Sequence, residues 1–227
     1  LLAASDGRRH PGSKQLSIIV SNYKRPRNLE ELVPALLSYP EVGEVIVVNG
    51  DKVGASYAGK GDARMTFVDN FDQPEYTLGR FKYASQAKKE TVMFLDDDQL
   101  PQREVVQRLL ECHAAAPRSL CGTWERRCDH GGYHYPPPQG GVPFAANMIL
   151  PGRGLVTSRD IVRNIWGAMT SDPKYKGFFD EVVSNKGDGE DILFNHVFRT
   201  LPGLGGGIRR VAADDAAFKQ MAQTGGG

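Results

Sequence analysis

Short apolar runs alternate with helix-like stretches through the first half of the chain. Four runs of aliphatic and β-branched side chains have the pattern of buried strands, at residues 16–20, 45–48, 65–68 and 92–95. Apolar side chains recur at helical spacing in three other stretches, at residues 29–37, 80–87 and 104–116. Pro34 lies inside the first of these stretches and should bend or delay that helix. The alternation predicts an α/β fold, in which a mainly parallel sheet carries helices on both faces.

The pattern changes after residue 120, where glycine and proline become dense. Shorter strand-like and helix-like pieces continue there, with strands at residues 121–126, 145–150 and 154–157 and helices at residues 161–168 and 192–200. We interpret this half as a mixed-sheet region continuous with the first, so that both halves form a single domain. The predicted divisions are a disordered leader at 1–15, a domain at 16–212 with halves at 16–101 and 102–212, and a tail at 213–227.

Charge and composition exclude little but narrow the choice of partners. The 227 residues include 28 basic and 27 acidic side chains, a formal net charge of +1. This balance gives no argument for nucleic acid or an anionic membrane as a general partner. No apolar run approaches the ~20 residues that a membrane-spanning helix needs. Of the three cysteines, Cys121 and Cys128 could pair across a hairpin, but three free thiols, Cys112 included, fit equally well.

Three consecutive carboxylates, Asp96, Asp97 and Asp98, follow the last of the four predicted strands. Like charges this close raise one another's pKa, so such a cluster usually persists because a cation lies beside it. Carboxylate oxygens suit Mg²⁺ or Mn²⁺, which in turn hold phosphate oxygens. Transferases that use nucleotide sugars hold a metal-bound diphosphate with a strand that ends in Asp-x-Asp. The alternative is a solvated acidic turn.

Polar residues end three of the predicted strands, at residues 21–25, 49–51 and 96–98. In open parallel sheets ligands bind beyond the carboxyl ends of the strands, so these groups should meet in one crevice. Arg25 and its neighbour Lys24 would contact a nucleotide there, or would be solvated loop charges. Arg80 begins a predicted helix and would bind a diphosphate through its guanidinium, or would be an ordinary helix-surface arginine.

The second half adds candidate groups for the reaction and for an acceptor. Glu190 and Asp191 open a predicted helix, either as a catalytic carboxylate pair or as acids that favour a helix start. His196, one turn further, would approach the metal or be an ordinary packed histidine. Aromatic side chains in the region rich in glycine and proline would hold an acceptor sugar on their faces or simply fill an irregular fold; these are Trp124, Tyr133, His134 and Tyr135.

Taken together, four stretches resemble glycosyltransferase family 64, the exostosin-like transferases with the GT-A fold. In the order of the family they are Tyr23-Lys24-Arg25, Val47-Val48-Asn49-Gly50, Gly79-Arg80-Phe81 with Glu90 through Asp98, and Asp188-Gly189-Glu190-Asp191-Ile192-Leu193-Phe194-Asn195. The resemblance covers about residues 16–200. Lys24 stands where the family has asparagine, and Glu75 replaces another asparagine. For a late arginine of the family, Arg209 and Arg210 are the candidates.

The resemblance implies a hexosyl- or N-acetylhexosaminyltransferase that uses a nucleoside-diphosphate sugar, typically a UDP-sugar, with retention of configuration and with Mn²⁺ or Mg²⁺. The acceptor would be a glycan or glycoconjugate, and the compartment the Golgi or endoplasmic reticulum lumen. Residues 16–101 would bind the nucleotide and residues 102–212 the acceptor. The implied roles are nucleotide binding by Tyr23, Arg25, Asn49, Arg80, Asp96 and Asp97, metal binding by Asp98, and catalysis by Asp191 with Glu190.

Three other hypotheses fit parts of the pattern. An inverting, family 2-like GT-A transferase would use Asp191 as general base. An inactive sugar-binding GT-A module would keep the fold without the reaction. A nucleotidyltransferase would share the α/β frame but would usually carry a glycine-rich loop after the first strand, where this chain has Ser21-Asn22-Tyr23-Lys24-Arg25-Pro26.

Overall fold

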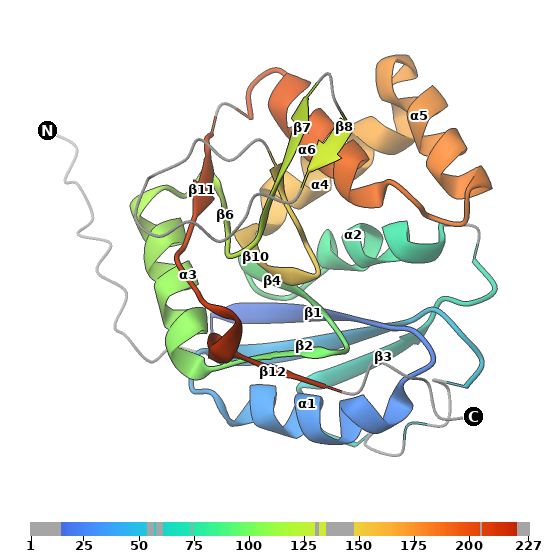
Figure 1. Ribbon diagram of the computed structural model, residues 1–227. Coiled ribbons are helices and arrows are strands. Elements are labelled where there is room, and N and C mark those ends of the chain that lie inside the picture. The colour runs from blue at the N-terminus through green and yellow to red at the C-terminus, as the bar shows by residue number, and fades with distance from the viewer. Residues whose placement is uncertain are drawn as a thin grey trace, which may run out of the picture.

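A seven-stranded mixed sheet forms the centre of the computed structural model (Figure 1). The structure describes residues 15–53, 57, 61–73, 75–129, 132–134, 148–204 and 206–221, and only the backbone at 127–129, 132–134 and 215. The strand order is β11-β6-β10-β4-β1-β2-β3. The strands are β1 (Leu16–Asn22), β2 (Val42–Asn49), β3 (Met65–Asp69), β4 (Thr91–Asp96), β6 (Leu120–Gly122), β10 (Arg153–Ser158) and β11 (Ile208–Arg210).

Parallel pairing dominates this sheet. β1 pairs in parallel with β2 and β4, β2 with β3, and β11 with β6, whereas β10 runs antiparallel to both β4 and β6. The register places Ser21 opposite Asp96 and Asn22 opposite Asn49. The predicted single α/β domain with a mainly parallel mixed sheet is therefore confirmed, and the polar ends of β1, β2 and β4 lie side by side.

Helices cover both faces of the sheet and produce two hydrophobic cores. Alternate side chains of one strand point to opposite faces, so Ile19 belongs to one core while Ile18 and Val20 belong to the other. α1 and α3 pack in the core of Ile18, and α2, α4, α5 and α6 in the core of Ile19 (Figure 1). The helices are α1 (Pro26–Ser38), α2 (Gly79–Ala84), α3 (Arg103–Ala115), α4 (Arg159–Ser171), α5 (Pro173–Ser184) and α6 (Glu190–Thr200), with 3-10 turns η2 (Tyr76–Leu78) and η3 (Asp215–Ala217).

The first helix differs from the sequence-based expectation. Pro34 neither delays nor ends α1, which begins at Pro26 and continues to Ser38. Proline suits the first turn of a helix, because the amide hydrogen that it lacks has no partner in the helix there. Pro26 therefore starts the helix early. None of the helices in the described ranges is long and apolar enough to cross a membrane.

A disulfide joins α3 to β6, between Cys112 and Cys121, with an S–S distance of 2.07 Å. Both alternatives drawn from the sequence are therefore wrong, the Cys121–Cys128 pair and the three free thiols. The disulfide closes a short loop, because α3 leads directly into β6 and only nine positions separate the two cysteines. The Cys121 side chain is fully buried in the core beneath α1 and α3.

Two small sheets complete the domain. β7 (Glu125–Asp129) pairs with β8 (Gly132–His134) and β9 (Met148–Ile149), and β5 (Gln99–Pro101) pairs with β12 (Phe218–Gln220). β12 lies within the predicted tail, 213–227, and its pairing with β5 corrects that prediction. Phe218 and Met221 are buried, and the Met221 amide donates to the carbonyl oxygen of Asp98 at 2.9 Å. Residues 215–221 thus belong to the domain.

Truncating Phe218 tests this correction. We expect Phe218→Ala to lower the free energy of unfolding by about 3 kcal/mol, the usual cost of emptying a buried phenylalanine site. Lys219→Ala, at an exposed position of the same strand, should change it by less than about 0.5 kcal/mol. Urea denaturation measures both. Equal, small effects would mean that this segment is a loose tail in solution.

Candidate functional site

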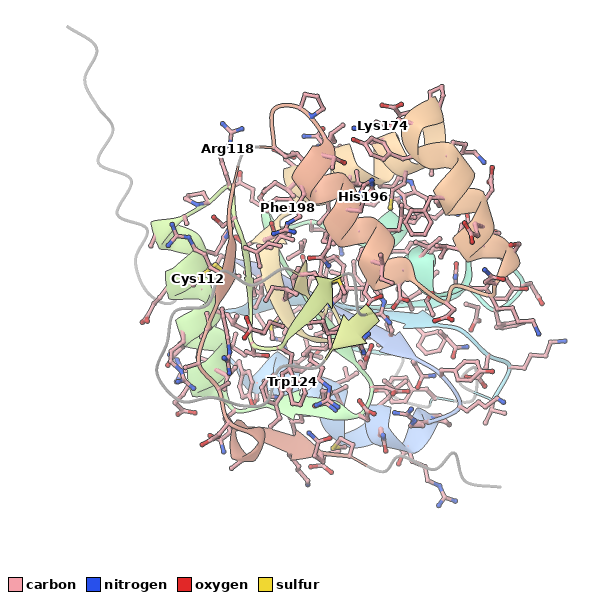
Figure 2. The ribbon with its side chains drawn as sticks, turned by 45° about the horizontal axis from the view of Figure 1, so that its top comes forward. Cys112, Arg118, Trp124, Lys174, His196 and Phe198 are labelled. Atoms are coloured by element: carbon pink, nitrogen blue, oxygen red, sulfur yellow. A yellow bond between two sulfur atoms is a disulfide. The ribbon has the colours of Figure 1, made fainter. Side chains whose placement is uncertain are left out.

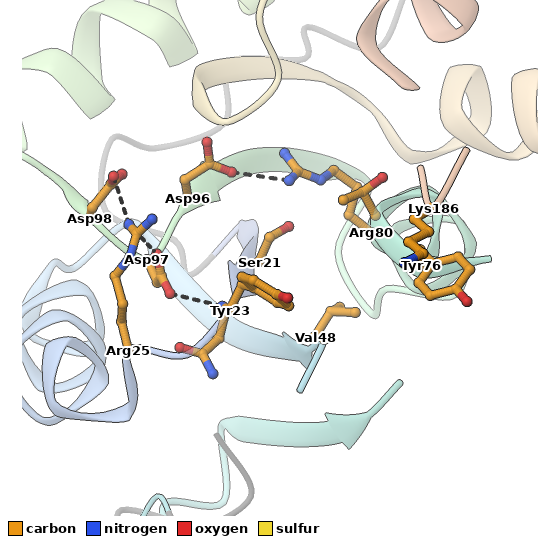
Figure 3. A pocket seen from close by; sticks show the side chains of 13 residues that line it. Ser21, Tyr23, Arg25, Val48, Tyr76, Arg80, Asp96, Asp97, Asp98 and Lys186 are labelled. Carbon is orange, nitrogen blue, oxygen red and sulfur yellow. Dashed lines mark hydrogen bonds and ion pairs between the residues drawn. The ribbon is translucent and has the colours of Figure 1, made fainter. Parts of the chain in front are cut away.

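A cavity of about 540 Å³ opens where β1, β2 and β4 end (Figure 3). It contains most of the predicted nucleotide and metal residues, namely Tyr23, Arg25, Arg80, Asp96, Asp97 and Asp98. Ser21, Val48 and Gly50 contribute the floor from the strand ends. Tyr76, Thr77 and Lys186 come from η2 and from the loop between α5 and α6. The parallel sheet therefore brings segments far apart in sequence to one edge, as the sequence predicted.

Arg25 neutralises two of the three aspartates. Its Nη1 atom lies 2.9 Å from Asp97 Oδ1 and 2.7 Å from Asp98 Oδ2 (Figure 3). The backbone amide of Tyr23 donates to the other oxygen of Asp97 at 2.9 Å. Burial nevertheless raises the pKa of Asp97 to about 7, because desolvation outweighs the Tyr23 amide and Arg25, and Asp98 and Asp96 add repulsion.

Arg80 pairs with the remaining aspartate of the cluster. Its Nη2 atom lies 3.0 Å from Asp96 Oδ1. The arginine is buried, whereas the side chain of Asp96 is 41% exposed and faces the cavity. Burial alone would lower the pKa of Arg80, but Asp96, Glu190 and Asp191 together raise it. The Arg80 guanidinium thus balances negative charge both in the aspartate cluster and at the predicted catalytic pair, Glu190 and Asp191.

Glu190 and Asp191 begin α6, as predicted, but neither lines the cavity. Asp191 is buried and accepts from Arg126 Nη1 of β7 at 3.1 Å. Asn195 holds this end of α6 in place, since its side chain bonds both the amide and the carbonyl oxygen of Ile149 in β9. Burial raises the pKa of Glu190, and Arg80 opposes that shift. Arg80 therefore interacts electrostatically with Glu190 and Asp191 as well as with Asp96.

Asn49 does not take the predicted role of a nucleotide ligand. Its side chain is fully buried and already occupied, because it accepts from Asn22 at 2.8 Å and donates to the carbonyl oxygen of Asp51 and to Asp69. A buried amide stays where its hydrogen bonds are satisfied. Asn49 fixes the ends of β1, β2 and β3 relative to one another and positions the cavity floor.

The predicted acceptor residues are only partly described. Trp124 lies between β6 and β7, with the guanidinium of Arg153 4.0 Å from its ring centre (Figure 2). Tyr133 is described only in its backbone, and Tyr135 lies outside the described residues. His196 packs on α5, 6.0 Å from the Tyr175 ring centre, so it is a packing residue and does not approach the aspartates (Figure 2).

Arg210 and Glu75 also have structural partners. Arg210 pairs with Glu125 at 3.2 Å on the outer strand β11, and neither it nor Arg209 lines the cavity. Glu75, which stands where family 64 has an asparagine, pairs with Lys82 at 2.8 Å. Its charge is therefore compensated locally.

Tyr76 and Lys186 line the cavity although the sequence analysis did not select them. A weak signal in the sequence is Gly187, which follows Lys186 and, as a glycine, permits the close approach of another segment. Its neighbour is Thr77, which donates its hydroxyl to the Gly187 carbonyl oxygen at 2.8 Å. A Cβ at Gly187 would lie 2.0 Å from the Thr77 hydroxyl oxygen, so only glycine permits this approach.

The carboxylates suit a metal only together with a ligand. Within the described ranges, no three His, Cys, Asp or Glu side chains gather closely enough to hold an ion alone. Mg²⁺ and related ions are often held by one or two carboxylates, with phosphate oxygens and water completing the shell. Asp96, exposed to the cavity, supplies such oxygens, whereas Asp98 accepts from Arg25 and Gln99 and would have to exchange one of these partners for an ion. The donor set therefore fits a metal that arrives with a phosphorylated ligand.

Comparison with known proteins supports the fold alone. No protein-family model and no curated protein matches the sequence. A solved structure, a 4-diphosphocytidyl-2C-methyl-D-erythritol synthase from Anaerococcus prevotii, aligns with a TM-score of 0.57 over 92% of this chain and 94% of that chain. The two sequences are 14% identical. The likeness confirms the Rossmann-like architecture and does not show membership of glycosyltransferase family 64.

The raised pKa of Asp97 gives a pH test in metal-free buffer. The unfolded chain loses this proton near the ordinary pKa of 3.8, and the folded protein near 7. Between these values the folded state binds more protons, so the contribution of Asp97 to stability falls as pH rises. At pH 8 with chelator, Asp97→Asn should therefore be more stable than the wild type, by at most about 4 kcal/mol.

Arg25 keeps Asp98 as a partner in this variant. The advantage of Asp97→Asn should disappear at pH 4, and Asp160→Asn, at an exposed carboxylate, should follow the wild type throughout. Thermal unfolding at both pH values measures the differences. A variant less stable than the wild type at pH 8 would show that the ion pair with Arg25 outweighs the burial of Asp97.

Proposed function

We propose that this protein is a metal-dependent glycosyltransferase that takes a sugar from a nucleoside-diphosphate sugar, in the first instance a UDP-sugar. The observation that carries the proposal is the cavity at the strand ends, where three aspartates meet two arginines and two exposed tyrosines. Carboxylates and arginines together suit a metal-bound diphosphate. Aromatic faces suit a nucleobase. The acceptor would be a glycan or glycoconjugate.

Arg80 would link donor binding to the reaction. Its guanidinium is buried beside Asp96, and it is the cation that Glu190 and Asp191 also face. A diphosphate at the aspartate cluster would therefore direct its sugar past Arg80 towards the start of α6. Arg80 would hold both Asp96 and the sugar-facing carboxylates in fixed places before the donor arrives, which lowers the cost of reaching the transition state.

A bound Mn²⁺ or Mg²⁺ would neutralise the negative charge that builds on the departing diphosphate. The residues present fit such an ion, with Asp98 as the predicted ligand and Asp96 beside it. Arg25 bridges Asp97 and Asp98 and so keeps the two carboxylates close together without an ion.

The carboxylates at α6 would stabilise positive charge on the sugar. Glycosyl transfer passes through a transition state that resembles an oxocarbenium ion, which a nearby carboxylate stabilises. Asp191 is oriented by Arg126 and by the anchored helix end, so its charge stays in one place. In a retaining reaction the leaving phosphate would take the acceptor's proton. In an inverting reaction Asp191 would take it as general base.

A nucleotidyltransferase is the rival that the solved structure supports, since a 4-diphosphocytidyl-2C-methyl-D-erythritol synthase shares this fold. The segment after β1 argues against it. It holds Ser21, Tyr23 and Arg25 at the cavity, where such enzymes usually carry a glycine-rich phosphate loop. The products separate the two reactions, because a nucleotidyltransferase releases diphosphate from a nucleoside triphosphate and a glycosyltransferase releases a nucleoside diphosphate.

Incubation with a panel of UDP- and GDP-sugars, with and without Mn²⁺, tests the proposal directly. We expect slow metal-dependent release of the nucleoside diphosphate from at least one donor. Diphosphate release from CTP or UTP in its place would establish the rival. NMR of the glycosylated product would then decide between retention, as in family 64, and inversion. Binding without any turnover would indicate an inactive sugar-binding module.

The metal should couple to nucleotide binding. UDP should raise the unfolding temperature in the presence of Mn²⁺ but not in the presence of chelator, because a ligand stabilises in proportion to its affinity for the folded state. Asp98→Asn should remove this metal dependence, while Asp160→Asn should keep it. Differential scanning fluorimetry measures the shifts. Equal stabilisation by UDP in chelator and in Mn²⁺ would rule out metal-assisted binding.

Asp191→Asn should separate catalysis from binding. The variant keeps the size of the side chain but loses the charge that acts in the transition state, so donor turnover should fall at least about a hundredfold, or about 3 kcal/mol. The affinity for UDP should stay near that of the wild type. Asp188→Asn, an exposed acid of the same loop, is the control. Turnover retained by Asp191→Asn would leave Asp191 as the partner of Arg126 only.

A further inference from the structure

The cavity has two chemically different ends. Asp97, Asp98 and Arg25 lie at one end, and Tyr76 and Lys186 lie at the other (Figure 3). If the metal-bound diphosphate occupies the carboxylate end, the nucleoside occupies the end of Tyr76 and Lys186. This step rests on the proposed function.

Two exposed aromatic rings line the cavity: Tyr76 lies at the nucleoside end, and Tyr23 lies next to Asp97, whose carboxylate accepts from the Tyr23 amide (Figure 3). Tyr23 and Tyr76 are 56% and 39% exposed, and they are two of the three large hydrophobic side chains that the described ranges leave exposed. Both line the cavity. A nucleobase stacked on such a ring gains affinity whichever base it is. The tyrosines therefore explain binding of a nucleoside but not the choice among bases.

Lys186 is the side chain that can make that choice. No hydrogen bond or ion pair engages its ammonium group within the described part of the chain. Arg25 and Arg80, the other cations of the cavity, are both paired with aspartates. An ammonium group donates hydrogen bonds and accepts none. Lys186 therefore selects a ligand atom that accepts.

The backbone at Lys186 is strained, which is a second and independent sign of function. Its φ is +56°, a left-handed conformation that glycine usually supplies at a helix end. Gly187 follows it and is held by Thr77, so the loop presents the lysine from a fixed place. Strain of this kind tends to persist at ligand sites, where the side chain is needed despite its cost.

We propose that Lys186 determines the specificity for the base, and that it selects nucleotides whose base carries a carbonyl oxygen at position 4 of a pyrimidine or position 6 of a purine. Uracil and guanine carry such acceptors at O4 and O6, whereas cytosine and adenine carry amino donors at the corresponding positions. UDP or GDP would receive a charge-assisted hydrogen bond from the ammonium group. CDP or ADP would place one donor against another.

The test compares nucleotides on matched variants. With Mn²⁺ present, calorimetry should show that the wild type binds UDP or GDP about tenfold or more tightly than CDP or ADP, the effect of one hydrogen bond to a charged group. Lys186→Met should bring the four affinities together, chiefly by weakening the tighter ones. Lys186→Arg should keep the preference. Lys174→Met, which removes an exposed charge on α5 (Figure 2), should behave as the wild type.

Two results would overturn the inference. An unchanged preference in Lys186→Met would remove Lys186 from base selection. An equal loss for all four nucleotides would make it a phosphate ligand. The nucleotide-free unfolding temperature adds a separate check, because Lys186→Gly should raise it by relieving the left-handed strain. A lowered temperature with an unchanged preference would assign the lysine to loop structure.

These outcomes are distinct from those of the proposed function. Base selection by Lys186 without any sugar transfer would contradict the proposed reaction and support this inference. Sugar transfer by a protein that ignores the identity of the base would do the reverse. A wild type that binds none of the four nucleotides would overturn both.

Discussion

A single buried cation, Arg80, determines how the two halves of the domain meet. A guanidinium removed from water is tolerated only where opposite charges surround it, and here the carboxylates come from β4 and from the start of α6. Asp96 belongs to the first half of the chain, and Glu190 and Asp191 to the second. The charge balance therefore holds the aspartate cluster at the end of β4 near the start of α6. Removing Arg80 would take the opposite charge away from Asp96 and from Glu190, while Asp191 would keep Arg126.

The parts of the site that sequence predicts are those that local rules control. Apolar runs identify strands, and a parallel sheet places the ends of its strands at one edge, so the meeting of Tyr23, Arg25 and the aspartates follows from pattern and topology. Acids at a helix start likewise locate Glu190 and Asp191 at the first turn of α6. The order of the motifs adds the resemblance to family 64, from which the proposal of a nucleotide-sugar site starts.

The parts that sequence missed depend on contacts between distant segments. Asn49 stands at the end of a strand, where a ligand-binding residue is expected, but its side-chain amide is bonded to residues at the ends of neighbouring strands. Only the register of the strands shows this. The partner of Cys121 depends on how α3 turns into β6. Lys186 carries no motif, and its place at the cavity comes from a helix end and from the contact between Thr77 and Gly187. Propensity and spacing contain no information on any of these.

The hydrogen bond between Met221 and Asp98 has a consequence for the order in which the site can form. β5 follows the aspartate cluster directly, and its pairing partner β12 is made more than a hundred residues later, as the span between Gln99 and Gln220 shows. While the chain is being synthesised, the core around β1, β2 and β4 can assemble with the aspartate loop held on one side only. The loop is completed only when β12 emerges from the ribosome, so the aspartate cluster takes its final place after almost all of the domain has been made.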